Sequence, residues 1–398
     1  MYTFQADSGS FSSKANYTLA ITLMKYQKIY PIDLLLNTNK IFYNSRNKQN
    51  FGKNFNEFSF QAKQYKSSQK KEIYVLVIGE SARYSSFHIN GYSRQTSPNL
   101  DNLDNLISFS NVFSPATLTF MSLPQLITRA TPDNLNLQFE EKSIIDAFKE
   151  AGFYTAWIST QNENDPAIKR LRGVTNYFHS SKLGLDNNSP YDTDIISNFK
   201  TVLKENGNRK FIVIHSLGSH FRYSKRYPPS FEKFKPALAR VGFDNIHISN
   251  KTKFINSYDN SILFTDFFLD LLIKELKNTE AVCTLTYVSD HGENLFDDER
   301  GLIQHGTENP GKEEYHIPLF IWFSNQYQKE NSEKTLAILN NKDKKAMSNT
   351  TFYTMLDLAN IGYHNSDQEL QKSIASPQYK EPTERKLISA SKKIILIN

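Results

Sequence analysis

The chain has 398 residues, of which 39% are hydrophobic and 22% are charged, and this balance excludes a wholly disordered protein. It carries 47 basic and 41 acidic residues, a net charge of +6. This mild excess argues against a dedicated nucleic-acid binder and is compatible with an anionic membrane surface or a phosphorylated substrate. Cys283 is the only cysteine, which excludes an intramolecular disulfide, a zinc ribbon and an iron–sulfur cluster.

The first 70 residues are rich in Asn, Lys, Gln and Ser, and we expect a tether with at most one short helix, at residues 29–36. Their best apolar run, residues 17–24, is far shorter than the roughly 18–20 residues that a membrane-spanning helix needs. The N-terminus also lacks the early basic residues of a signal peptide. From the sequence as it stands, we expect neither a membrane span nor a signal peptide.

From residue 71 onward, short apolar runs alternate with amphipathic stretches. Runs that are apolar on both faces and rich in Val, Ile and aromatic residues indicate strands buried between two helix layers. Strands are predicted over residues 73–79, 153–158, 211–215, 282–288 and 319–323, and helices over residues 143–150, 192–205 and 253–276. This alternation predicts one doubly wound α/β sheet of about 260 residues. After residue 325 we expect one helix, near residues 351–360, and a polar tail.

Polar residues that directly follow buried strands are the first functional candidates, because ligands of open α/β sheets bind at the carboxyl ends of the strands. Glu80 follows the strand at residues 73–79, and Asp290 and His291 follow the strand at residues 282–288. Carboxylate oxygens with an imidazole nitrogen suit a zinc ion. The alternative is that the strands simply exit into hydrogen-bonded polar turns.

A third candidate is the hydroxyl-rich segment at residues 114–124, which contains Thr117 and Thr119 and leads into an apolar helical stretch. Such hydroxyls usually cap a helix. The functional alternative is a nucleophile at a helix N-terminus, where backbone N–H groups stabilise an alkoxide and a bound phosphate. A threonine hydroxyl needs a metal or a base to lower its pKa before it can attack.

Seven motifs together resemble, in this order, those of the phosphoethanolamine transferases of the bacterial envelope. They are Val-Ile-Gly-Glu-Ser-Ala-Arg (77–83), Gly-Tyr-Ser-Arg-Gln-Thr-Ser-Pro (91–98), Gly-Ser-His-Phe (218–221), Arg-Tyr-Pro (226–228), Asn-Ser-Tyr-Asp-Asn-Ser (256–261), Ser-Asp-His-Gly-Glu (289–293) and His-Gly-Thr (305–307). The resemblance implies the three-layer α/β/α sandwich of the alkaline phosphatase and sulfatase-like superfamily. It also implies a catalytic domain at residues 71–325, a linker at residues 1–70 that follows a membrane domain absent from this chain, and an extension at residues 326–398 that packs on the catalytic domain.

The same resemblance implies one zinc ion held by Glu80, Thr119, Asp290 and His291. It identifies Thr119 as the nucleophile, because the nucleophile of the family lies three residues before a Ser-x-Pro, here residues 122–124.

Six more residues outside this ligand set are candidates for the site. His220 is expected to transfer protons in catalysis, as acid for the leaving group and base for the acceptor. His305, Gln161 and Asn162 are expected to contact the substrate. Glu293 and His215 are expected to orient the ligands, which metal sites commonly require.

The function implied is zinc-dependent transfer of phosphoethanolamine from phosphatidylethanolamine to lipopolysaccharide, on lipid A or a core sugar, or to a related envelope glycan, through a phosphothreonine intermediate. The expected setting is the periplasmic face of the Gram-negative inner membrane, with a membrane surface as a partner, no nucleic acid and a monomeric chain. Relatives that modify lipid A commonly carry several disulfides, which Cys283 alone cannot form, so the acceptor stays open.

Two other interpretations remain. A phosphodiesterase or phosphatase of the same fold would use water in place of the acceptor, and a truncated fragment would fold without catalysing a reaction. A sulfatase is excluded, because the Ser-Leu-Pro-Gln-Leu at residues 122–126 lacks the Arg of the Cys/Ser-x-Pro-x-Arg motif from which sulfatases make formylglycine.

Overall fold

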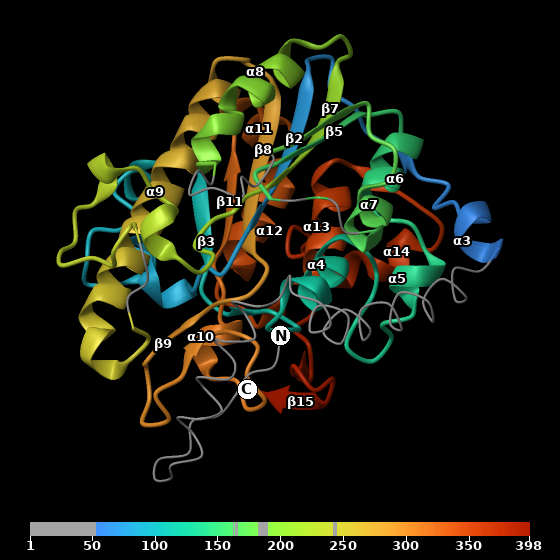
Figure 1. Ribbon diagram of the computed structural model, residues 1–398. Coiled ribbons are helices and arrows are strands. Elements are labelled where there is room, and N and C mark those ends of the chain that lie inside the picture. The colour runs from blue at the N-terminus through green and yellow to red at the C-terminus, as the bar shows by residue number, and fades with distance from the viewer. Residues whose placement is uncertain (1–52, 162, 164–165, 182–189, 242–244) are drawn as a thin grey trace.

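The computed structural model describes residues 53–161, 163, 166–181, 190–241 and 245–398 (Figure 1). The helix predicted at residues 29–36 and the candidate residue Asn162 lie outside the described residues.

A seven-stranded sheet forms the centre of the molecule. Its strands, in spatial order, are β3 (Leu106–Phe109), β11 (Leu319–Phe323), β8 (Val282–Ser289), β2 (Glu72–Gly79), β7 (Arg209–His215), β5 (Tyr154–Ser159) and β6 (Tyr177–Ser180). All five predicted strands are present. The two unpredicted strands, β3 and β6, lie at the sheet edges and are only partly buried, so they lack a continuous apolar run. The sheet is parallel except for β11, which runs antiparallel to both of its neighbours.

Helices cover both faces of this sheet, which confirms the three-layer α/β/α architecture (Figure 1). On one face lie α8 (Ile196–Lys204) and α9 (Lys251–Lys277), and on the other lie α4 (Thr119–Ile127), α6 (Ile144–Glu150) and α13 (Thr350–Leu358). Every residue of β2 is buried. Because side chains alternate along a strand, Leu76 and Ile78 join the core on the α4 side, and Val75 and Val77 join the core on the α9 side.

The region after residue 325 differs from the sequence prediction of one helix and a polar tail. The predicted helix is α13, but α11 (Asn325–Glu330), α12 (Ser332–Asn341), α14 (Ser366–Glu369) and a hairpin of β14 (Arg385–Ile388) with β15 (Ile394–Ile397) accompany it. These elements are short and half-exposed, so their apolar residues are too few to produce a strong periodic signal. Two of the segments after residue 325 also pair with earlier ones: β1 (Lys63–Gln64) pairs with β13 (Ile361–Gly362), and β4 (Val112–Phe113) with β12 (Ala346–Met347).

The remaining elements are short. They are the helices α3 (Lys53–Glu57), α5 (Leu137–Glu140), α7 (Pro166–Arg172) and α10 (Lys312–Tyr315), and the paired strands β9 (Asn294–Leu295) and β10 (Ile303–Gln304). Within the described ranges, no helix is both long enough and apolar enough to cross a membrane.

Candidate active site

Two neighbouring parallel strands, β2 and β8, end side by side at the candidate site. Gly79 pairs with Ser289 at the last position of this ladder, so the next residues, Glu80 and Asp290, leave the sheet together. Both carboxylates are buried. The two strands are adjacent in the sheet, as convergence of these carboxylates requires.

His291 completes a compact group with the two carboxylates. Its Nε2 lies 3.3 Å from Asp290 Oδ2 and 3.5 Å from Glu80 Oε1. Its Nδ1 lies 2.9 Å from the Gly292 carbonyl oxygen, to which Nδ1–H donates a hydrogen bond. This bond fixes the ring, so Nε2 faces the carboxylates and can act as a ligand.

Helix α4 begins at Thr119 and brings this residue to the same group. Thr119 Oγ1 lies 3.1 Å from Glu80 Oε2 and 3.2 Å from His291 Nε2. The N-cap residue of the helix is Leu118, and no side chain caps it, so the capping alternative is wrong for Thr119. The other candidate hydroxyl, Thr117 Oγ1, is buried and has no hydrogen-bond partner in the described part of the chain.

The pKa values of the two carboxylates shift in opposite directions, because the two groups share one buried site. Burial raises the pKa of Glu80, but His291, with smaller effects of His220 and His305, lowers it to about 2. Burial and then the charge of Glu80 raise the pKa of Asp290 to about 6. Two adjacent buried carboxylates repel each other when both are ionised, so the group favours a bound cation.

The residues present fit a zinc ion. The ligand atoms of Glu80, Asp290 and His291 all lie within 4.8 Å of one another. Asp290 Oδ2 is buried and has no hydrogen-bond partner among the described residues, an arrangement that is costly unless a cation satisfies the oxygen. Two carboxylates, one imidazole and the Thr119 oxygen form a donor set of the kind that tetrahedral zinc accepts. These four residues are therefore the ones that would hold the metal.

A glycine lets the neighbouring loop approach this group closely. Gly218 has a φ of +47°, and a Cβ atom there would lie 2.7 Å from the Glu80 carbonyl oxygen. The next residue, Ser219, donates its backbone N–H to that same oxygen at 2.9 Å. Any larger residue at 218 would therefore displace the backbone that carries Glu80.

His305 lies beside the group and is held by Glu293. Its Nδ1 lies 2.5 Å from Glu293 Oε2, and its ring centroid is 4.0 Å from that of His291. The other oxygen of Glu293 accepts a hydrogen bond from Tyr223 Oη. Burial lowers the pKa of His305, but the charge of Glu293 and the hydrogen bond outweigh it and raise the pKa to about 9. The arrangement suits the roles predicted for His305 and Glu293, which stay predictions.

Gln161 contacts a candidate ligand in the structure. Its Nε2 donates to Glu80 Oε2 at 3.1 Å and to the Ser216 carbonyl oxygen at 2.9 Å. This places the amide where it orients Glu80. The substrate contact predicted for Gln161 stays a prediction.

His215 and Glu163 form a buried pair behind Gln161. His215 Nδ1–H donates to Glu163 Oε1 at 2.9 Å, and His215 Nε2 lies 3.2 Å from Gln161 Nε2. Burial lowers the pKa of His215, but the Glu163 charge outweighs this effect, so the pKa is raised. Glu163 is not among the residues predicted from the sequence. Its signal in the sequence was weak, because Glu163 lies four residues after the end of β5, whereas Glu80 directly follows β2.

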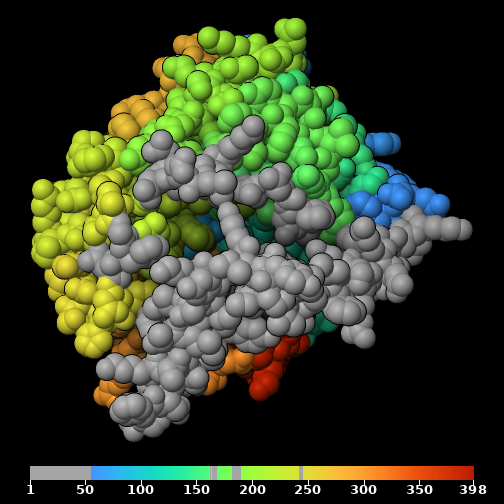
Figure 2. Space-filling model, in the orientation of Figure 1, coloured from blue at the N-terminus to red at the C-terminus, as the bar shows by residue number. Residues whose placement is uncertain are grey.

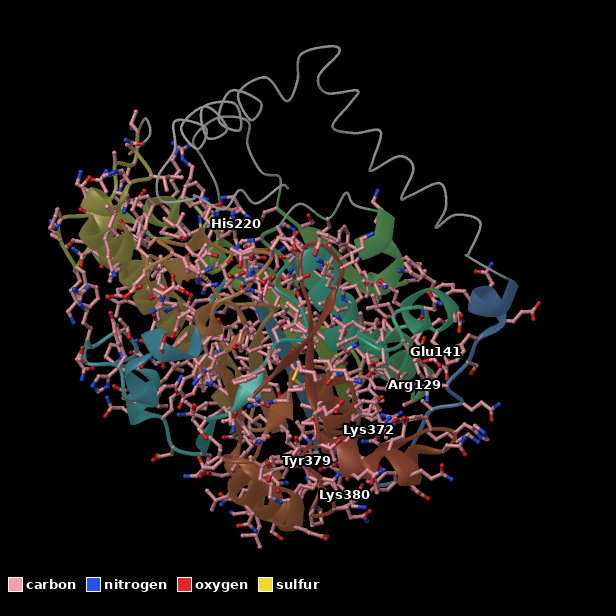
Figure 3. The ribbon with its side chains drawn as sticks, turned by 90° about the horizontal axis from the view of Figure 1, so that it is seen from below. Arg129, Glu141, His220, Lys372, Tyr379 and Lys380 are labelled. Atoms are coloured by element: carbon pink, nitrogen blue, oxygen red, sulfur yellow. The ribbon has the colours of Figure 1, made fainter. Side chains whose placement is uncertain are left out.

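His220 makes no hydrogen bond to the compact group within the described part of the chain, although its charge lowers the pKa of Glu80. It is exposed, and the hydrogen bond the structure gives it joins its Nδ1 to the Phe221 carbonyl oxygen at 3.3 Å. Figure 3 shows it well separated from the Arg129–Glu141 ion pair beside α4. The structure thus brings Glu80, Thr119, Asp290 and His291 together with His305, and leaves His220 on a loop open to solvent.

Comparison with known proteins agrees with this fold. The Sulfatase family model matches residues 72–361. Phosphoethanolamine transferase EptC of Escherichia coli O18:K1:H7 is 31% identical over 328 residues, which cover 80% of this chain and 55% of that protein. The crystal structure of the C-terminal periplasmic domain of E. coli EptC in complex with Zn superposes with a TM-score of 0.74 at 29% identity and covers 85% of this chain and 94% of that one.

A more distant structure supports the fold alone. A protein in the alkaline phosphatase superfamily from Vibrio parahaemolyticus is 14% identical, with a TM-score of 0.55, over 84% of each chain. The present chain spans about half the length of the curated relatives that it matches, such as the 55% of EptC. From the family match and the EptC similarity together, we conclude that this chain belongs to the sulfatase family and contains a catalytic domain homologous to the periplasmic domains of phosphoethanolamine transferases.

Proposed function

We propose that this chain transfers phosphoethanolamine from phosphatidylethanolamine to a hydroxyl or phosphate of lipopolysaccharide or a related envelope glycan, through a phosphothreonine at Thr119. The observation that carries the proposal is the contact of the Thr119 hydroxyl with Glu80 and His291, beside a buried Asp290 oxygen that has no hydrogen-bond partner among the described residues. The similarity to EptC supports the choice of group transferred.

In the first displacement, Thr119 Oγ1, which has lost its proton to solvent, attacks the phosphorus of the donor as an alkoxide, and the bond from phosphorus to the diacylglycerol oxygen breaks. A bound zinc would lower the pKa of the threonine hydroxyl and offset negative charge on the phosphoryl oxygens. Glu80 and His291 hold the hydroxyl in place, with Oγ1 3.1 Å and 3.2 Å from them. The departing diacylglycerol oxygen takes a proton, which we assign to His220, because its exposed loop position is open to a large leaving group.

In the second displacement, the acceptor oxygen attacks the same phosphorus and the bond to Thr119 Oγ1 breaks. The acceptor loses its proton to the base that protonated the first leaving group, and Thr119 Oγ1 departs as the alkoxide that attacked in the first displacement. His305 is placed to hold a phosphoryl oxygen, since Glu293 Oε2 holds its Nδ1 at 2.5 Å and its ring lies against that of His291.

The same relatives support a proposal for the setting of the reaction. The solved E. coli EptC domain is described as periplasmic, and we infer that this domain also works at the periplasmic face of the inner membrane, as a monomer and without nucleic acid. Lipid A, a core sugar and another glycan remain equal candidates for the acceptor. We also keep the division into a linker at 1–70, a catalytic domain at 71–325 and an extension at 326–398 as part of this proposal.

The direct test is mass spectrometry of the zinc-loaded chain after incubation with phosphatidylethanolamine. A covalent intermediate adds roughly 123 Da, the phosphoethanolamine increment, to the peptide that contains Thr119. Thr119→Ala must lack the adduct, and Thr117→Ala must keep it. An adduct on another residue, or none while donor is consumed, contradicts the proposal.

The acceptor experiment separates transfer from hydrolysis. With lipopolysaccharide present, transfer yields modified lipopolysaccharide and diacylglycerol in equal amounts. Phosphodiesterase activity instead releases free phosphoethanolamine at a rate that the acceptor does not change. A chain that binds zinc, forms no adduct and consumes no donor is the non-catalytic fragment.

A further inference from the structure

Asp192 is a buried carboxylate that the proposed mechanism does not use. It begins a short 3-10 helix, Asp192–Ile195, that leads into α8. Figure 2 shows the α8 segment, in lime green, at the upper surface of the molecule, yet Asp192 is only 4% exposed. Its carboxylate therefore points into the protein. Burial raises the pKa of Asp192, because an ionised group loses its hydration there, so the carboxylate needs hydrogen-bond donors inside the fold.

Three donors from the ends of two neighbouring strands surround this carboxylate. Thr160, which directly follows β5, donates its hydroxyl to Asp192 Oδ1 at 2.5 Å. The backbone nitrogen of Leu217 lies 2.8 Å from the same oxygen and 2.8 Å from Thr160 Oγ1. The N–H of Gly218 donates to Asp192 Oδ2 at 3.0 Å. Both carboxylate oxygens are thus used, and they join the end of β5 to the backbone that follows β7.

The turn that receives these bonds, residues 217–220, packs directly on the backbone of a candidate zinc ligand. The N–H of Ser219 donates to the Glu80 carbonyl oxygen, against which Gly218 is also packed. From the other side, Ser261 Oγ of α9 donates to Ser219 Oγ at 2.9 Å. The base of the turn is therefore fixed by Asp192, by α9 and by the end of β2.

The last residue of this turn is His220, the residue to which we assign proton transfer. Within the described part of the chain, its side chain bonds only to the carbonyl oxygen of the next residue, Phe221. Its charge still reaches Glu80, whose pKa it lowers. The position of the His220 ring relative to the site therefore depends on the base of the turn.

We propose that Asp192 is a positioning residue, which holds the turn at residues 217–220 so that His220 can transfer protons at the phosphoryl site. The inference rests on the proposed function in one respect, namely that His220 is the acid and base. A carboxylate suits this task, because hydrogen bonds to a charged acceptor are stronger than those to a neutral one, and its two oxygens bind two successive N–H groups. An asparagine has one acceptor oxygen, so it can keep the bond to Leu217 and must lose the bond to Gly218.

Asp266, on α9, provides a matched control. It is also fully buried, and it accepts hydrogen bonds from the N–H of Leu100 at 2.8 Å and from the N–H and Nδ2 of Asn99 at 3.1 Å and 2.7 Å. Asp266 thus holds a different turn through the same kind of bonds. The variants Asp192→Asn and Asp266→Asn remove the same chemistry at two places, of which the first is joined to the turn that carries His220.

Two water-soluble donors separate positioning from mere support of the fold. One is a phosphatidylethanolamine with butyryl chains, whose alcohol leaving group needs a proton, and the other is the nitrophenyl ester of phosphoethanolamine, whose leaving group does not. Release of the leaving group is measured in the first turnover, before an acceptor is needed. We expect Asp192→Asn to slow release of the alcohol roughly 10–100-fold per folded molecule, to release nitrophenol near the wild-type rate and to keep its zinc.

Two further comparisons complete this test. Asp266→Asn should keep both rates, even where it lowers the stability of the fold. In a His220→Ala background, Asp192→Asn should cause no further loss, because both changes remove the same proton transfer. Equal losses on the two donors, a loss of zinc, or a further loss in that background overturns the proposal.

Hydrogen–deuterium exchange keeps this proposal separate from the proposed function. The peptide that contains residues 217–220 should exchange about ten-fold faster in Asp192→Asn than in wild type and at the wild-type rate in Asp266→Asn. Thr160→Val, which removes only the hydroxyl beside Leu217, should also speed exchange, and Thr160→Ser should match wild type. This second pair decides the matter if Asp192→Asn does not fold. Unchanged exchange overturns the proposal. If wild type releases neither leaving group, the proposed function fails, and the exchange rates still decide whether Asp192 holds the turn.

Discussion

The compact group of Glu80, Asp290 and His291 at the strand ends and the loop that carries His220 are held in place by different means. Glu80 and Asp290 leave adjacent strands whose pairing is fixed residue by residue, and hydrogen bonds hold both their backbone and their side chains. The His220 side chain is exposed and, among the residues that the structure describes, has one hydrogen bond, to a neighbouring backbone oxygen. A sheet fixes a metal site without help from substrate, whereas a loop can adapt to a large leaving group. Substitutions in the two regions should therefore change different observables.

Thr119→Ala should give the largest effect on turnover. It removes the nucleophile, so we expect a loss on the order of 10⁴-fold or more and no covalent adduct. Because Thr119 does not cap its helix, the unfolding free energy should change by no more than about 1 kcal/mol. Donor consumption and urea unfolding measure the two quantities.

Thr117→Ala is the matched control for that substitution. Thr117 Oγ1 is buried without a hydrogen-bond partner among the described residues, so its removal costs no such bond, and turnover should stay near the wild-type rate. If Thr117→Ala were inactive and Thr119→Ala active, the position assigned to the nucleophile would be wrong.

Asp290→Ala should remove the zinc. The expected consequences are a zinc content near zero after dialysis and a loss of turnover on the order of 10³-fold, since the metal supplies several kcal/mol of charge stabilisation. Chelation should lower the Tm of wild type and leave that of the variant unchanged. Because burial and Glu80 raise the pKa of Asp290, ionised Asp290 destabilises the metal-free fold, so the metal-free variant should be at least as stable as metal-free wild type. A variant with full zinc content would refute the metal site.

His220→Ala should slow turnover by roughly 10²–10⁴-fold, the usual scale for the loss of a general acid or base, with zinc still bound. The loss must appear with an ordinary alcohol leaving group and disappear with a nitrophenyl ester, which departs without a proton. A histidine that only supports its loop would lower stability and leave the rate per folded molecule unchanged. Wild-type turnover on the poor leaving group would exclude His220 as the acid, and His305→Ala would be tested next.

The difference between the two regions also explains which strands and which site residues could be predicted from the sequence. Continuous apolar runs identified the five central strands, and polar residues at their ends placed Glu80, Asp290 and His291 at one edge of the sheet. Edge strands β3 and β6 carry a weak apolar signal, and the C-terminal hairpin was expected to be a polar tail. Glu163 was missed because the residues it contacts, such as His215, lie far from it in the sequence and meet it only when β5 and β7 pair.

Substitutions of Glu163 should have the smallest effect on turnover, but they should change how stability depends on pH. The Glu163 charge outweighs burial and raises the pKa of His215 in the folded state. The protonated His215–Glu163 pair therefore stabilises the fold. This stabilisation is fully present below the unfolded histidine pKa of about 6.5 and is lost as pH rises through the higher folded pKa. Wild-type unfolding free energy should therefore decline with rising pH above about 6.5, and Glu163→Gln should flatten that decline while it keeps an acceptor for His215 Nδ1–H.

Glu163→Ala removes the acceptor as well, so it should destabilise the fold by about 3 kcal/mol and weaken zinc binding about ten-fold, because the support behind Gln161 and Glu80 is lost. Glu163→Gln should keep most of the zinc affinity, since the hydrogen bond that orients His215 remains. The measurements are urea unfolding from pH 6 to pH 9 and zinc titration of both variants. Identical pH profiles for wild type and Glu163→Gln would mean that His215 is neutral in the folded protein, and the pair would then act through its hydrogen bond alone.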